Sequence, residues 1–379
     1  MTFSFTPEIA FSSELKEFTI YTSDPSADVE IHVDGIGYIY RQQLYSYNGR
    51  ITLYELDTLI EDAMRAADLT LGNLSFSVLA EGRKFERYVL VVCCSQVPLR
   101  AGNTAQWLQE NFLSLSDMRR LRWEAPVNIS AVLAPSEAAL WKVSFKASTT
   151  DGEPVTGSYE VRLDDGGSDW DLIQFYLDKN LLLQKAQEAA EGAEIASVDM
   201  VTVRCGARVM YLYFSDEMRH AALFEFKNAF NVRDFVSFPG QKSGSSEVSV
   251  SEARLPDRVL QYDRRVLRSY KMVWPAITLH DSYLVDDFLQ SPDIQAVAFS
   301  VGLRDGAHGA PLGSPAIPAD ESFVSLPVLI TESKMDCPEF DSLISAEFTF
   351  RFADIRQVSP LLALLDFSVF NGCFTSEFS

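Results

Sequence analysis

Apolar and polar residues alternate along many short segments of this chain, and this period of two is typical of strands that bury one face. Between Val29 and Val33 every second residue is apolar, and Phe348, Phe350 and Phe352 repeat the pattern near the carboxyl end. Further strands are expected at 18–21, 38–40, 74–79, 88–92, 143–146, 157–163, 198–203, 209–214 and 324–330. The pattern therefore predicts a β-rich chain.

Helical periods interrupt the strands at a few places. One helix is expected from about Leu53 to Ala67, and Thr52 with Glu55 forms a capping box at its start. A second helix is expected to open near Ser168 or Asp169. Its apolar stripe would consist of Trp170, Ile173, Leu177 and Leu181.

Two further helical segments complete this pattern. A capped helix is expected to begin at Thr278 and to stop at Ser291, because a proline follows that serine. A short helical patch is expected at 116–121. The expected helices are thus few, and strands separate them.

The order of these elements repeats along the chain. Residues of about 18–95 and of about 140–215 are each expected to form two strands, a helix and two more strands. The sequence therefore predicts an α+β, β-rich fold with two related β-β-α-β-β units followed by a β-sandwich-like C-terminal region. The expected divisions are a first unit at 1–97, a connecting segment at 98–135, a second unit at 136–240 and a C-terminal β-rich domain at 241–379.

Two segments rich in small and polar residues are expected to be exposed loops. Gln241 to Glu252 carries many serines, and Gly302 to Ala319 carries many Gly, Ala and Pro residues. Both are candidate contact segments, because flexible arms can become ordered on neighbouring molecules. Before the first of them, two strands are expected around a turn at Asn231, since asparagine tolerates left-handed backbone geometry.

The net charge restricts the classes of partner. The 379 residues include 53 acidic and 32 basic ones, which gives a formal charge of −21. Nucleic acids and anionic membrane surfaces require clustered cations, so this balance argues against both as partners. The sequence has no apolar run of about 18 residues, and its amino end lacks the basic and apolar regions of a signal peptide. We therefore expect a protein made in the cytoplasm without a membrane span.

The five cysteines are expected to be reduced and buried. They are Cys93, Cys94, Cys205, Cys337 and Cys373. Their number is odd, and the adjacent pair lies in an apolar strand, in which neighbouring side chains point to opposite faces. The sequence has no CxxC pair, which removes the common zinc and redox interpretations.

The residues that usually carry catalysis are sparse and scattered. The four histidines, His32, His220, His280 and His308, lack HxxxH or HExxH spacing, and no GxSxG elbow offers a serine nucleophile. We therefore predict a non-enzymatic chain without catalytic, cofactor-binding or metal-binding residues. The alternative, an unrecognised hydrolase, would require His32, His220 or His280 to meet an acid in a pocket.

Three kinds of segment resemble functional motifs only superficially. The segment 239–244 lacks the first glycine and the helix of a phosphate loop. The acidic stretch 164–171 lacks the ligand alternation of a calcium loop and is expected to be a solvated hairpin turn and helix N-cap. Paired carboxylates such as Asp286–Asp287 and Glu61–Asp62 are unavoidable in so acidic a chain, and they carry no information about glycosidase chemistry.

Two basic clusters stand out in this acidic chain. They consist of Arg119, Arg120 and Arg122 and of Arg264, Arg265 and Arg268. A solvated structural role is the default, and as partner sites they fit an acidic face of a neighbouring subunit better than nucleic acid. The 26 Phe and 14 Tyr residues are expected mostly in sheet cores, with some as interface anchors.

Five segments in the last part of the chain share strand-and-turn patterns with known proteins. They are 223–240, 264–271, 286–293, 326–334 and 347–357. In these segments the chain resembles a group of virion proteins from tailed phages and prophages of Bacteroides-type gut bacteria. The shared patterns include no catalytic motif.

The resemblance implies a tail- or baseplate-associated subunit that is assembled in the host cytoplasm and placed in the virion. Such a subunit would contact copies of itself in a ring or tail and neighbouring virion proteins. We therefore expect a phage structural protein that acts by oligomeric assembly. The alternative is a non-catalytic carbohydrate- or peptide-binding protein that uses an aromatic face.

Overall fold

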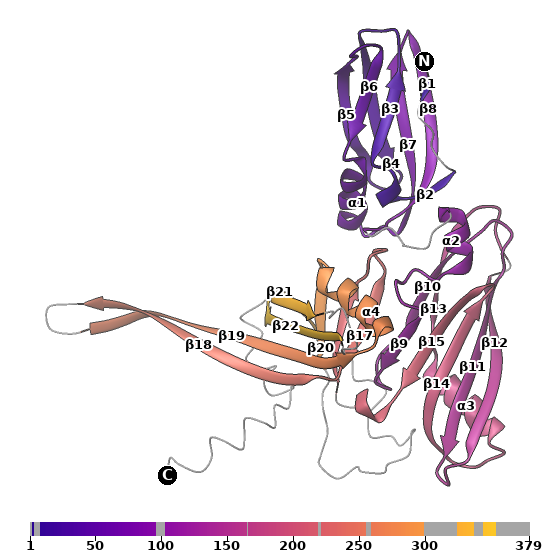
Figure 1. Cartoon of the computed structure of the whole chain (residues 1–379), viewed down its shortest axis with the longest axis vertical. Helices are drawn as coiled ribbons and strands as arrows, with labels where there is room; N and C mark the ends of the chain where they lie inside the picture. The colour runs from indigo at the N-terminus through magenta and orange to yellow at the C-terminus, as the bar shows by residue number, and fades with distance from the viewer. Residues whose placement is uncertain are drawn as a thin grey trace.

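The computed structural model describes residues 2–3, 8–95, 103–164, 166–218, 221–254, 259–298, 324–336 and 344–353 (Figure 1). This part of the chain consists mostly of strands, arranged in five sheets, with four α-helices. The predicted α+β, β-rich fold is confirmed. The predictions for Gly302–Ala319, His220, His308, Cys337 and Cys373 concern residues outside the described part.

The first unit packs two sheets and helix α1 (Leu56–Ala66) around one core. The larger sheet has the strand order β2-β8-β7-β4-β5, and the smaller sheet has the order β1-β3-β6. Phe18 of the smaller sheet stacks on Phe76 of the larger one, with 4.5 Å between ring centroids. The strands are β1 (Thr2–Phe3), β2 (Ile9–Phe11), β3 (Glu17–Tyr21), β4 (Ser26–Val33), β5 (Gly37–Tyr45), β6 (Arg50–Tyr54), β7 (Leu71–Ala80) and β8 (Arg83–Val92).

The second unit is built in the same way around α3 (Lys179–Ala189). Its larger sheet has the order β12-β11-β14-β15-β9, and β10 pairs with β13 in the smaller sheet. Trp141 is buried between Phe112 and Phe175, with centroid distances of 5.4 Å and 4.8 Å. The strands are β9 (Met118–Leu121), β10 (Asn128–Leu133), β11 (Ala139–Thr149), β12 (Pro154–Asp164), β13 (Asp171–Tyr176), β14 (Ile195–Cys205) and β15 (Arg208–Phe214).

The two units share one topology. In each, a hairpin (β4–β5 or β11–β12) lies beside a second hairpin (β7–β8 or β14–β15). A short strand that precedes both hairpins, β2 or β9, pairs in parallel with the last strand. The predicted β-β-α-β-β repeat is therefore present, and each copy also includes this edge strand and a smaller partner sheet, which has three strands in the first unit and two in the second.

The C-terminal region contains one antiparallel sheet with the order β17-β16-β20-β21-β22-β19-β18, and α4 (Leu279–Gln290) contacts it. Phe348 of β22 lies 5.6 Å from Phe224 and 5.2 Å from Phe288 of α4 between ring centroids, which places the aromatic residues in the core. The strands are β16 (Ala222–Lys227), β17 (Arg233–Phe238), β18 (Gln241–Arg254), β19 (Val259–Ile277), β20 (Ile294–Ala298), β21 (Val324–Asp336) and β22 (Ile344–Phe352).

The hairpin β16–β17 belongs to this C-terminal sheet. The sequence placed residues 222–238 in the second unit at 136–240, but β16 pairs with β20. The two strands around Asn231 are confirmed, and Asn231 has the expected positive φ of 59°. Helix α4 is also confirmed, because Thr278 and Asp281 form its capping box and Ser291 is its C-cap.

Helix α1 begins later than the sequence indicates. The predicted capping box of Thr52 and Glu55 is wrong, because Thr52 lies in β6, where it pairs with Thr19. Glu55 is the N-cap in a left-handed conformation, with a φ of 57° and no side-chain cap. The edge of the smaller sheet therefore determines where this helix can start.

The helix expected near Ser168 is wrong in position. Residues 171–176 form β13, which pairs along its whole length with β10, so the apparent helical stripe is split between a strand and a later helix. Helix α3 begins at Lys179, and the carboxylate of its N-cap Asp178 accepts bonds from the N–H groups of Asn180 and Leu181. The acidic stretch at 164–171 therefore connects two strands and caps no helix.

The helical patch expected at 116–121 is also wrong. Residues Met118–Leu121 form β9, the parallel edge strand of the second unit. Arg119 and Leu121 are buried, whereas Met118 and Arg120 are partly exposed, which is the alternation of a strand. Helix α2 (Thr104–Glu110), which the sequence analysis did not predict, precedes it, and the side chain of Asn103 caps its first turn.

Candidate functional site

Of the histidines considered for catalysis, the structure describes His32 and His280, which lie on different elements. His32 lies on β4 of the first unit, with its Nδ1 3.6 Å from a carboxylate oxygen of Asp34. His280 lies in the first turn of α4, with its Nδ1 3.2 Å from Asp117. Among the described residues no group of three or more His, Cys, Asp or Glu could hold a metal ion. No helix in those residues is both long and apolar enough to span a bilayer.

The described cysteines are core residues. Cys93, Cys94 and Cys205 are free and buried, as predicted. Burial raises the pKa of the Cys93 thiol to about 12 and that of the Cys205 thiol to about 11. Thiols with such pKa values stay protonated at neutral pH and are therefore weak nucleophiles.

The basic cluster of Arg119, Arg120 and Arg122 forms ion pairs inside the chain. The pairs are Arg119–Asp234 at 2.7 Å, Arg120–Asp281 at 2.5 Å and Arg122–Glu124 at 2.9 Å between nitrogen and oxygen. The expected solvated structural role is therefore wrong for Arg119, which is 3% exposed, and the same burial excludes Arg119 from a partner site. Arg264, Arg265 and Arg268 lie on β19, and their side chains are outside the described part.

A junction of apolar side chains joins the two units to the C-terminal sheet. Phe230, in the turn between β16 and β17, stacks on Trp107 of α2 at 5.2 Å and lies 6.0 Å from Phe11 of β2 between ring centroids. All three side chains are buried. The junction consists of Ile9, Phe11, Val92, Cys94, Trp107, Leu108, Leu113, Val132, Ala229, Phe230 and Val232.

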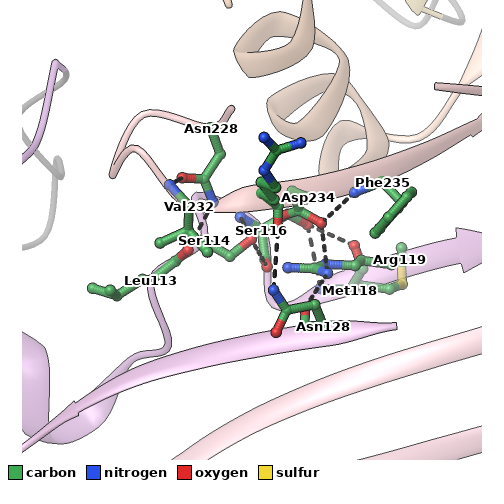
Figure 2. A network of polar contacts seen from close by, with 11 residues as sticks. Leu113, Ser114, Ser116, Met118, Arg119, Asn128, Asn228, Val232, Asp234 and Phe235 are labelled. Atoms are coloured by element: carbon green, nitrogen blue, oxygen red, sulfur yellow. Dashed lines mark hydrogen bonds and ion pairs between the residues drawn. The ribbon is translucent and has the colours of Figure 1, made fainter. Parts of the chain in front are cut away.

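Two asparagines hold this turn in the junction. The Asn228 amide donates to the carbonyl of Leu113, and its Oδ1 accepts from the N–H of Val232 (Figure 2). The same Oδ1 also accepts from the N–H of Phe230. The Asn231 amide donates to the carbonyl of Leu69 in the first unit at 3.1 Å. The C-terminal sheet is thus bonded to both earlier parts of the chain.

A buried ion pair lies next to the turn. Arg119 of β9 is 2.7 Å from Asp234 of β17, and these side chains are 3% and 2% exposed (Figure 2). Arg119 also donates to the carbonyl of Asn128 at 3.1 Å, and Asp234 accepts from the N–H of Phe235 at 2.7 Å. A buried pair of this kind contributes orientation between the parts it joins, because neither charge can be left alone without a large cost.

Asp287 of α4 adds a second buried carboxyl group. It is 4% exposed. Burial and the nearby charge of Asp234 raise its pKa to about 8, although a hydrogen bond from the Ala229 N–H and the charge of Arg65 oppose the shift. The group is therefore mostly protonated at neutral pH. Nothing in the sequence distinguishes the buried acid of the pair Asp286–Asp287 from an exposed one.

A two-stranded ribbon projects from the C-terminal sheet. Strands β18 and β19 pair from Gln241 with Val273 to Arg254 with Val259, whereas β22 pairs with β19 only from Tyr270 to Ile277. Among the described residues, no third strand pairs with the outer part of the ribbon, and Figure 1 shows the ribbon extending away from the other sheets. The side chains of 248–268 lie outside the described part.

The prediction of an exposed loop at Gln241–Glu252 is wrong, because these residues lie in β18. The abundance of serine and glycine favoured a loop in the sequence analysis. A period of two was nevertheless present, because Val248 and Val250 alternate with Glu247, Ser249 and Ser251. Pairing with β19 decides the conformation of this segment.

Gly240 is required where the ribbon leaves the sheet. A Cβ atom on this residue would lie 1.9 Å from the carbonyl oxygen of Val273, which is backbone and cannot rotate away. We expect Gly240→Ala to destabilise the C-terminal sheet by about 1–3 kcal/mol. Chemical denaturation would measure this. Gly167→Ala is the matched control, because Gly167, like Gly240, has no positive φ and its added Cβ would meet no atom closer than 3.9 Å.

Comparison of the sequence with protein-family models and with curated proteins finds no match. The candidate sites therefore rest on geometry. They are the junction with its buried charges, which fixes the parts of the chain, and the projecting ribbon, which leaves strand edges without partners.

Proposed function

We propose that the chain is a non-enzymatic structural subunit of a phage tail or baseplate, which acts by oligomeric assembly within the virion. The observation that carries this proposal is the ribbon of β18 and β19. An isolated two-stranded ribbon is only marginally stable in water, and its edges present N–H and C=O groups that another strand can bind. A neighbouring molecule would supply the missing contacts.

The junction supports the same function. A subunit that repeats its contacts around a ring must hold its parts at fixed angles, since each error is repeated at every interface. The turn at 228–232 is inserted between α2 and the first unit, and Lys227 forms an ion pair at 2.9 Å with Asp68 of the first unit. The chain is therefore built as one body that carries a projecting arm.

The charge and the resemblance of residues 223–357 to virion proteins agree with this proposal. A formal charge of −21 keeps copies apart in the cytoplasm until complementary surfaces meet, and it disfavours nucleic acid as a partner. The proposed partners are copies of the chain and neighbouring virion proteins.

Shortening the ribbon tests the proposal. Ser245 and Ser269 are paired, and their hydroxyl oxygens are 2.8 Å apart, so residues 246–268 can be replaced by Asn-Gly to close a two-residue hairpin. We expect the full chain to assemble as its concentration rises, and the shortened chain to stay monomeric with an unchanged melting temperature. Light scattering after gel filtration would measure the mass of both.

A full chain that remains monomeric at every concentration, and that binds no tail protein, would contradict the proposal. Equal assembly of the full and shortened chains would show that the ribbon is not the contact. The melting temperature serves as the control, because a misfolded variant would lose it.

A second function is favoured by one observation. Tyr38 and Tyr88, on the outer face of the larger sheet of the first unit, are 61% and 64% exposed. Aromatic side chains on a flat polar sheet are suited to binding carbohydrate or peptide. A glycan array separates the two functions, because an assembly subunit binds no glycan there.

A further inference from the structure

The larger sheets of the two units each have one face in the core and one face directed outward. The first outer face is formed by β5, β4, β7 and β8, and the second outer face is formed by β12, β11, β14 and β15. These strands are equivalent in the shared topology. The two faces can therefore be compared position by position.

The second outer face is basic. Lys142 and Lys146 of β11, Arg162 of β12 and Arg204 of β14 are exposed on it. Its carboxylates are Glu160, opposite Lys142, and Asp199 at a bulge on its margin. Four cations on one face are unexpected in a chain with a formal charge of −21.

Three of these cations have no counterion in the part of the chain that the structure describes. Among the described residues, Lys142, Lys146 and Arg204 form no ion pair, whereas five other basic side chains of the second unit do so, namely Arg119, Arg120, Arg122, Lys185 and Arg208. Lys142 and Arg204 are moreover direct cross-strand partners. Like charges at such positions destabilise a sheet, so folding alone does not explain them.

The first outer face has the opposite sign. It carries Asp28, Glu30, Asp34 and Glu86, and its cations are Arg41 and Lys84. Both cations are already paired, Arg41 with Glu30 at 2.9 Å and Lys84 with Glu86 at 2.6 Å. Asp28 and Asp34 are exposed and give this face its excess of negative charge.

We propose that the second outer face of one copy docks on the first outer face of the next copy. This contact rests on the proposed assembly function and names the partner surface, a second copy of the chain. Both faces are exposed within one copy, so the two faces of the same copy do not cover each other. Because the two faces differ, the contact is heterologous, and its repetition gives a ring or a filament.

The area of the two faces indicates how large an interface their contact can form. Four strands spaced by ~4.8 Å with about seven residues each give a planar area of roughly 400 Å². A standard interface covers about 800 Å² per partner, so docking of the faces needs a second contact, which the ribbon supplies. Tyr38 and Tyr88 provide aromatic anchors within a face whose charges provide steering and specificity.

Charge reversal tests the contact. We expect Lys142→Glu/Lys146→Glu/Arg204→Glu to weaken self-association by roughly tenfold or more at about 50 mM salt, because two negative faces then meet. Asp28→Lys/Asp34→Lys/Glu86→Lys should have the same effect through two positive faces. An equal mixture of the two variants should assemble again, since every contact between unlike copies is complementary. Sedimentation velocity would measure all three samples.

A matched control distinguishes the effect of charges on this face from the effect of net charge. Lys16→Glu/Lys185→Glu/Lys334→Glu makes the same change in formal charge at other places in the chain, and it should leave assembly unchanged. Both test variants keep a net negative charge, because three reversals change the formal charge of −21 by six, so bulk attraction cannot explain rescue on mixing.

The outcomes distinguish this contact from the proposed function. If the wild type assembles and neither reversal weakens it, or if mixing fails to restore assembly, the docking of the two faces is overturned while assembly through the ribbon stands. If the wild type stays monomeric, the docking of the two faces is overturned, and the proposed function is overturned with it if the chain also binds no tail protein. If the basic face binds heparin and the reversals abolish that binding without changing assembly, the face serves a polyanion and the contact between copies is overturned.

Discussion

Replacing Asp234 with Asn will destabilise the folded chain by about 3–5 kcal/mol, the largest loss that we expect from a change at the junction. The substitution keeps the size of the side chain and the bond from the Phe235 N–H. It leaves the Arg119 guanidinium, which is 3% exposed, without a counterion. The loss of stability comes from this buried charge without a counterion. Urea denaturation at neutral pH, followed by fluorescence of the junction tryptophan Trp107, would measure it.

Two further variants show that burial is responsible. Glu225→Gln breaks the ion pair with Arg233, whose side chain is 49% exposed, and should cost less than about 1 kcal/mol. Arg119→Met combined with Asp234→Leu removes both charges and should recover most of the stability lost in Asp234→Asn. A similar loss in Glu225→Gln and Asp234→Asn would contradict the explanation.

Replacing Asp287 with Asn will change how the stability of the chain depends on pH. The folded chain holds a proton on Asp287 up to a pKa of about 8, whereas the unfolded chain releases it near an ordinary pKa of 3.8. Between these values the unfolded state binds fewer protons, so this group makes the wild type less stable as pH rises, by at most about 1.4 kcal/mol per pH unit. Asparagine does not titrate and removes this loss.

Denaturant midpoints at several pH values between 4 and 9 would measure the effect. The stability difference in favour of Asp287→Asn should grow up to pH 8 and then stay level. Asp286→Asn is the matched control, because Asp286 bonds to the exposed Gln290 and is itself only partly buried. Parallel pH profiles for the wild type and Asp287→Asn would show that Asp287 is ionised throughout.

Much of the fold follows from local pattern. The strands with strict alternation, such as Val29–Val33 and Ala346–Phe352, and the capped helix α4 were predicted, because one side of each must be buried and the caps are local. Even the repeat was visible. These features depend on residues only a few positions apart.

The remaining features depend on distant partners. The stripe through Trp170, Ile173 and Leu177 looked helical, but pairing of β13 with β10 outweighs it. The serine-rich strand β18 is a strand because β19 lies beside it. Arg119 and Asp234 are far apart in the sequence, so no local pattern shows that the first arginine of a basic cluster is buried against an acid. The candidate sites were therefore not predictable from the sequence.

The late position of the Phe230 turn in the sequence affects the order in which the parts of the chain fold during synthesis. The ribosome synthesises the amino end first. Each unit can form its two sheets from its own residues before the following unit is synthesised, because β2 and β9 precede the strands with which they pair. The turn at 228–232 is synthesised only after both units. Until then the first unit is held to helix α2 by contacts such as that of Phe11 with Trp107, at 5.3 Å between ring centroids, and the contacts of the turn are missing. Synthesis of the remaining residues adds the C-terminal sheet, and the turn then bonds that sheet to both earlier parts of the chain.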